Sequence, residues 1–91
     1  MAKITLQPVQ LGTQSADREG CLAFADGKLV AVLVRLSEEL HGADGRAGQW
    51  CLEAGFGACE VGVLSVLFDS LEAARGWITE CLKETADRMT P

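Results

Sequence analysis

The side chains best suited to chemistry in this 91-residue chain are four cysteines and a single histidine. The cysteines are Cys21, Cys51, Cys59 and Cys81, and the histidine is His41. A thiol next to an imidazole can act as a nucleophile when a third group orients the ring, and acidic residues flank the histidine. We therefore keep open a small thiol-dependent enzyme that uses His41 with Cys51 or Cys59, and we assign no catalytic residue.

The same cysteines lack the spacing of a metal site. Structural zinc sites usually bring their ligands in close pairs such as C-x₂-C, whereas Cys51 and Cys59 are separated by a glycine-rich bend. The acidic residues between positions 38 and 44 do not match the spacing of an EF-hand loop. We expect no metal and no cofactor, and four thiols that act as ordinary small apolar side chains.

The charge balance narrows the range of partners. Asp and Glu together number 13 against 8 Lys and Arg, which gives a formal net charge of −5. Nucleic acids and anionic membranes attract basic proteins, so neither is an expected partner. No stretch approaches the roughly 20 apolar residues of a membrane-spanning helix, and residues 1–12 lack the apolar core of a signal peptide. The expected location is the cytoplasm.

The elements that must position these side chains begin with residues 21–36, which read as two apolar strands joined by Asp26-Gly27. Asp-Gly between apolar runs is typical of a two-residue β-hairpin turn. The expected pairs are Ala25–Lys28, Phe24–Leu29, Ala23–Val30 and Leu22–Ala31. One predicted face holds Leu22, Phe24, Leu29, Ala31 and Leu33, and the other holds Cys21, Ala23, Val30, Val32, Val34 and Leu36. Both faces are apolar, so both need cover.

Two further segments are predicted to be strands. Residues 4–11 alternate in polarity, and Pro8 restricts them to an edge or a bulge because proline cannot donate a ladder hydrogen bond. Residues 49–54 form a third main strand, with Trp50 and Leu52 on one side. Around these strands, we expect one helical turn over residues 37–42 and a loop containing a short strand over 61–68.

The C-terminal segment is predicted to be a helix from residue 70 to about 88. Asp69 or Ser70 can cap its start, and Asp69 with Glu72 has the spacing of a capping box. One apolar stripe at the helical period holds Leu71, Ala74, Ile78, Cys81, Leu82, Thr85 and Met89. This stripe can cover one face of the sheet, and the chain has no second helix long enough to cover the other.

Residues 68–77 resemble the helix start of the three-stranded DNA-binding arm domains of phage-type integrases and the related plant AP2 domains. In those domains Phe and Ser or Thr precede a helix that contains Glu, Ala and an aromatic residue. The resemblance implies a sheet packed on a helix, with the far sheet face entering the major groove through Arg and Lys. Here residues 49–56 carry no basic side chain, and the hairpin offers only Lys28 and Arg35.

Together these patterns predict an α+β domain spanning 1–91, with a frayed tail at 89–91. An antiparallel meander of three to four strands is covered by the one C-terminal helix. The leading interpretation is an interaction module that binds itself, as a homodimer, or another protein. The competing interpretation is a monomer in which residues 4–11 and 61–68 fold over the second face. A nucleic-acid binder ranks third because of the net charge.

The candidate interface residues are large apolar side chains of the hairpin together with aromatic and small residues elsewhere. They are Leu22, Phe24, Leu33, Trp50, Ala73, Gly76 and Trp77. Gly76 lies on the outward side of the predicted helix, where glycine costs about 1 kcal/mol relative to alanine. Either the chain tolerates that cost, or a neighbour packs closely over Ala73, Gly76 and Trp77.

Overall fold

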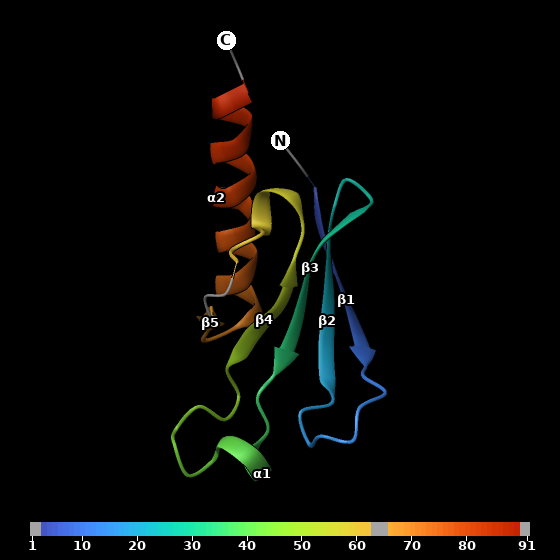
Figure 1. Ribbon diagram of the computed structural model, residues 1–91, viewed down its shortest axis with the longest axis vertical. Helices are drawn as coiled ribbons and strands as arrows, with labels where there is room; N and C mark the ends of the chain where they lie inside the picture. Colours follow the sequence, from blue (N-terminus) through green and yellow to red (C-terminus); the bar gives the residue numbers. More distant parts are fainter. Residues whose placement is uncertain (1–2, 63–65, 90–91) are drawn as a thin grey trace.

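The computed structural model describes residues 3–62 and 66–89 and shows an antiparallel sheet with one long helix against it (Figure 1). The elements are β1 (Ile4–Gln10), β2 (Glu19–Ala25), β3 (Lys28–Arg35), α1 (Glu38–His41), β4 (Trp50–Gly55), the 3-10 turn η1 (Gly57–Cys59), β5 (Leu67–Phe68) and α2 (Leu71–Met89). The five strands follow one another in the order β1-β2-β3-β4-β5. The predicted α+β meander is confirmed, with one strand more than expected. Met89 ends α2, and the rest of the predicted tail, 90–91, lies outside the described residues.

The β2–β3 turn forms as predicted, but the strand pairing beyond it is shifted by one residue. Asp26 and Gly27 have φ angles of 52° and 84°, the positive values that a type I′ hairpin turn requires. Phe24 pairs with Leu29 as expected, whereas Ala23 pairs with Ala31, so Val30 is an extra residue in β3. A slip of one residue moves each following side chain to the other face. The predicted faces of β3 were therefore wrong beyond the bulge.

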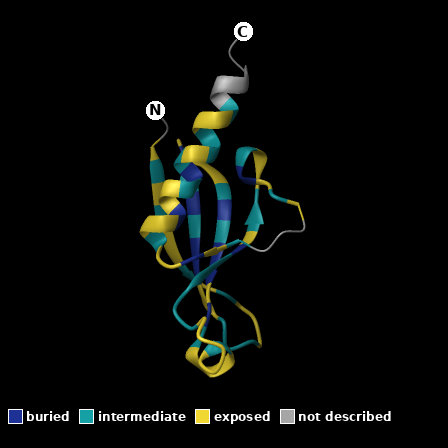
Figure 2. Cartoon of the chain, turned by 90° about the vertical axis from the view of Figure 1, so that its left-hand side faces the viewer, coloured by how far each residue is buried: buried dark blue, intermediate teal, exposed yellow. Residues whose placement is uncertain are grey.

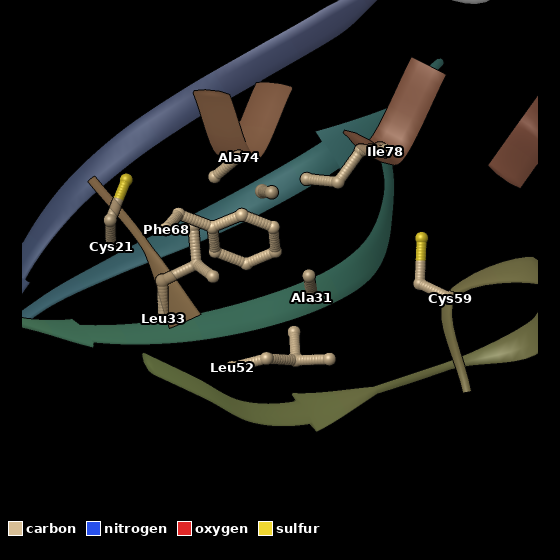
Figure 3. Close-up of a cluster of buried hydrophobic side chains, with 9 residues drawn as sticks. Cys21, Ala31, Leu33, Leu52, Cys59, Phe68, Ala74 and Ile78 are labelled. Carbon is tan, nitrogen blue, oxygen red and sulfur yellow. The ribbon is translucent and has the colours of Figure 1, made fainter. Parts of the chain in front are cut away.

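The face of the sheet that packs against α2 holds the core (Figure 3). Its buried cluster consists of Cys21, Ala23, Ala31, Leu33, Leu52, Cys59, Phe68, Ala74 and Ile78. The small side chains of Ala23, Ala31 and Ala74 let the helix approach the sheet closely, which favours dense packing. Leu33, expected beside Leu22 on one face, instead lies fully buried in this core because of the bulge.

The predicted C-terminal helix is confirmed, as is its apolar stripe from Leu71 to Thr85; the side chain of Met89, the last member of the stripe, lies outside the described residues. The Ser70 hydroxyl caps the helix by accepting a 3.1 Å hydrogen bond from the Ala73 amide. Asp69, the other candidate cap, accepts a hydrogen bond from the Gln49 side chain instead. On the predicted stripe, Ala74 and Ile78 are completely buried against the sheet.

Gly76 lies exposed on the outer side of α2, and a Cβ built there meets no atom within 4 Å. Nothing in the described chain packs over it, so glycine there costs helix stability without filling a tight contact. We expect Gly76→Ala to raise the free energy of unfolding by about 1 kcal/mol. Urea denaturation measures this change, and an unchanged or lower midpoint would show that an external contact occupies the site.

The strand β1 is a sheet edge, as its proline predicts. The Lys3 carbonyl accepts a hydrogen bond from the Asp26 amide, and the Leu11 amide donates one to the Arg18 carbonyl. The backbone groups of Lys3 and Leu11 therefore point toward β2. Backbone groups alternate in direction along a strand, so Pro8 directs its nitrogen away from β2. The ladder between β1 and β2 therefore loses no hydrogen bond at the proline.

Candidate functional site

The face of the sheet turned away from α2 is covered by no other described helix or strand (Figure 1), whereas Figure 2 views the molecule from the side that α2 covers. The strand register sets its side chains in three rows. The rows are Thr5–Phe24–Leu29, then Gln7–Leu22–Val32–Ala54, then Val9–Gly20–Val34–Cys51–Leu67. We call this surface the open face. β1 is a strand of this sheet, and Val61 and Val66 pack against the helix-side core. At the end near α1, the Leu11 side chain lies over Gly20, and Val34 is only 7% exposed, so this end is partly covered.

The open face is apolar and carries no ionisable carboxylate, ammonium or guanidinium group in its three rows. Leu29 is 37% exposed and Leu67 is 39% exposed, although both are large hydrophobic residues. Glu53 is the extra residue of a second bulge, where Val32 pairs with Ala54 and Leu33 with Leu52, and it lines a pocket together with Cys51 and Leu67 of the open face. Exposed contiguous apolar surface of this kind is typical of binding sites.

The total surface of the chain is larger than a compact monomer of its mass requires. The accessible area is 6035 Å² for 9.7 kDa, whereas a compact monomer of that mass exposes about 5100 Å². The radius of gyration is 13.8 Å, against about 12 Å for a compact chain of this length. The principal extents of 48 × 23 × 22 Å show that the elongated shape of the chain contributes to this excess.

A groove of about 640 Å³ opens at the end of this surface that lies near α1. Its lining includes the apolar side chains Val34, Leu36 and Cys51, with the loop after β1 forming a wall. Arg46 and Glu53 stand among the polar residues that line it. The open face is thus hollow at one end, while its other end carries the exposed Leu29 beside the hairpin turn.

Asp17 holds together the loops beside this groove. Its carboxylate accepts a 2.7 Å hydrogen bond from the Ser37 amide and lies 3.0 Å from His41 Nε2. His41 Nδ1 is buried without a hydrogen-bond partner, and the closest charged group to it is Asp44, at 3.8 Å. Asp44 in turn forms a 2.8 Å ion pair with Arg46. Asp17, Asp44 and Arg46 are therefore each held by a partner within the chain.

The pKa of Asp17 lies below its ordinary value of 3.8: burial raises it, but hydrogen bonds from Ser37 and His41 outweigh that effect. Ionised Asp17 therefore stabilises the folded chain above pH 3.8, and this contribution is lost as pH falls through the lowered pKa. We expect the Ser37 amide to shift in an NMR titration with a midpoint below 3.8. Asp17→Asn keeps an acceptor oxygen and should abolish that titration. A wild-type midpoint at or above 3.8 would contradict the hydrogen bonds from Ser37 and His41 to Asp17.

The thiols do not have the environment of an activated nucleophile. Burial raises the pKa of Cys51, which nearby Glu53 and Asp17 raise further. Cys59 lies in the core on the helix side, where burial and neighbouring Cys81 raise its pKa to about 11. Within residues 3–62 and 66–89, no hydrogen bond joins His41 to a cysteine. Its Nε2 contacts Asp17, and its buried Nδ1 has no hydrogen-bond partner. A reactive cysteine needs the opposite, a lowered pKa.

The structure separates the predicted interface residues into three groups. Leu22 and Phe24 lie on the open face. Leu33 and Trp50 belong to the helix side, as does Trp77, whose ring packs 5.5 Å from Phe68. Ala73 and Gly76 lie exposed on the outer side of α2. Sequence reasoning did not include Val32 and Leu67 as interface residues, although the apolar run of β3 was a usable signal.

Comparisons with family models, with curated proteins and with solved structures each found no match to this chain. The described residues contain no cluster of three or more His, Cys, Asp or Glu side chains suited to holding a metal ion. Among the helices that the structure describes, none is both long enough and apolar enough to cross a membrane. The resemblance to DNA-binding arm domains implies Arg and Lys on the open face, but its three rows contain neither.

Proposed function

We propose that the protein is a small cytoplasmic interaction module that forms a homodimer through its open face. The observation that carries this proposal is the apolar surface on the side of the sheet away from α2, whose three rows hold no charged side chain and which no described helix or strand covers. Burying side chains such as Leu22, Phe24 and Val32 stabilises a complex by about 1.5–3 kcal/mol each. A small domain has a total stability of only about 5–14 kcal/mol, so covering this face is a large effect.

A second copy of the chain fits this surface on charge grounds. Each copy carries a formal charge of −5, so two copies repel one another wherever acidic surfaces meet. The three rows of the open face contain no such charge, and a two-fold interface brings the same patch of both copies together.

The sheet edge is a less suitable interface than the open face. A partner strand adding to β1 needs a donor at each outward backbone position, and Pro8 supplies none. The opposite edge, β5, is only two residues long. Association through the open face requires neither edge.

The test places a charge at the centre of the proposed interface with Val32→Glu. Two copies would then bring two buried carboxylates together, which should weaken dimerisation by at least about 100-fold. Multi-angle light scattering of the wild type should give twice the 9.7 kDa chain mass at micromolar concentration, and the variant should give the chain mass. Circular dichroism checks that both are folded.

Leu40→Glu is the matched control, because Leu40 is 53% exposed in α1 and lies off the open face. This variant should remain dimeric, since the introduced charge stays in water. A wild-type chain that is monomeric at 100-fold higher concentration would overturn the proposal and favour a self-sufficient monomer. A dimer that Val32→Glu leaves intact would also overturn it, because the interface would lie elsewhere.

A further inference from the structure

We infer that Cys59 and Cys81 form a redox-sensitive pair, which a small-molecule disulfide such as oxidised glutathione converts into a disulfide bond within the chain. Both are free thiols in this structure. Their side chains face each other, close enough for a hydrogen bond between the two thiol groups. The other two thiols point elsewhere, because the Sγ atoms of Cys21 and Cys51 each donate over 3.8 Å to the backbone carbonyl of the next residue.

The fold holds Cys59 in a fixed place beneath α2. Its side chain is fully buried in the core and points from η1 to the side of the sheet on which Ile78 of α2 lies (Figure 3). Its backbone lies directly against β4, so close to Gly55 that a Cβ there would overlap the Cys59 carbonyl. A sulfur atom anchored in this way loses little further freedom when it forms a bond, which favours the reaction.

Cys81 reaches the same place from α2. It follows Ile78 by three residues, which puts both side chains on one side of the helix. It packs against the buried cluster that contains Cys59, and η1 as a whole is in contact with α2. Because Cys81 is only partly buried, a dissolved disulfide meets its sulfur first. The pair therefore consists of one accessible thiol and one buried thiol next to it.

The bond forms by two successive thiol–disulfide exchanges. The Cys81 thiolate attacks one sulfur of oxidised glutathione, and the other half leaves as a thiolate that takes up a proton. Cys59 then loses its proton and attacks the Sγ of Cys81, so that the second glutathione leaves and is protonated in turn. The two cysteines lose two electrons, and the glutathione disulfide gains them and becomes two thiols.

The environment of the pair makes this exchange slow and its product stabilising. Burial raises the pKa of both thiols, that of Cys59 to about 11, so little thiolate is present at neutral pH. The pair therefore responds to sustained oxidation. Once formed, the bond closes the chain between residues 59 and 81, and a disulfide stabilises a fold by restricting the unfolded chain.

The test treats the folded wild-type chain with excess oxidised glutathione, blocks the remaining thiols with iodoacetamide and maps the peptides by mass spectrometry. Digestion with trypsin and a protease that cuts after glutamate separates Cys51, Cys59 and Cys81 from one another. We expect a link between residues 59 and 81 in a chain that runs as a single copy on a non-reducing denaturing gel. The melting temperature should rise by at least about 10 °C, and a reductant should reverse the rise.

Cys51→Ser is the matched control, because it removes a partly exposed thiol outside the pair and should leave the link and the shift unchanged. Cys81→Ser should lose both. A glutathione adduct that stays on Cys81, a link to Cys51, a link between two chains or no link at all would overturn the inference. The wild-type peptide map decides among these results even if Cys81→Ser does not fold.

The inference does not depend on the proposed homodimer. Cys59 and Cys81 lie on the helix side of the sheet, away from the open face. A wild-type monomer in light scattering would remove the proposed function and leave the redox pair standing. A failed link would remove the redox pair and leave the homodimer standing, so the two failures are distinguishable.

Discussion

Leu33→Ala is expected to lower the free energy of unfolding by about 2–5 kcal/mol. Leu33 is fully buried between the sheet and α2, and it pairs with Cys21 on one side and Leu52 on the other. Removing its side chain leaves a cavity among strands that cannot collapse independently. A domain of this size has about 5–14 kcal/mol in total, so the variant loses a large share of it. Urea denaturation at fixed protein concentration measures the loss.

Leu40→Ala is the control for that measurement, because it removes the same atoms from a side chain that is 53% exposed. Its free energy of unfolding should stay within about 0.5 kcal/mol of the wild type. If both variants lost the same stability, the register that buries Leu33 would be wrong. The comparison thus tests the Val30 bulge. Without the bulge, Leu22 would pair with Ala31, and Leu33 would share a face with Leu22 instead of lying in the core.

Gly55→Ala is expected to destabilise the fold by about 2–3 kcal/mol. A Cβ at Gly55 would overlap the backbone carbonyl of Cys59 and lie 2.7 Å from its carbonyl carbon. The obstructing atoms are backbone, so no side-chain rotation relieves the contact. The η1 turn would have to move away from β4, taking the buried Cys59 out of the core.

The matched comparison is Gly76→Ala, in which the same methyl group enters open space. The two substitutions should change the unfolding midpoint in opposite directions. If Gly55→Ala were neutral, η1 could not lie against β4 as the structure places it. Far-UV circular dichroism during thermal unfolding is sufficient to compare both variants.

Local sequence signals predicted most of the elements, and the long-range pairing set the rest. The Asp26-Gly27 turn and the helix capped by Ser70 each depend on a few adjacent residues, and both form as expected. The faces of β3 depend on whether Val30 is bulged, which no neighbouring residue announces. Because of this one extra residue, Val32 rather than Leu33 shares a face with Leu22, and Leu33 lies in the core.

The candidate site was predictable only in part for the same reason. Leu22 and Phe24 precede the turn in β2, so their expected placement on one shared face survives. The contact between Asp17 and His41 joins residues 24 positions apart. It depends on how two loops meet after the sheet has formed, and their sequences alone do not reveal that meeting.

The proline in β1 also limits how large an assembly can become. Strands with a complete outward row of donors and acceptors can recruit further chains without end, as in fibrils. Pro8 interrupts that row, and β5 is too short to template growth at the other edge. In the proposed dimer the two open faces cover each other, so the described sheet would offer a third chain no equivalent docking place, and assembly should stop at two copies.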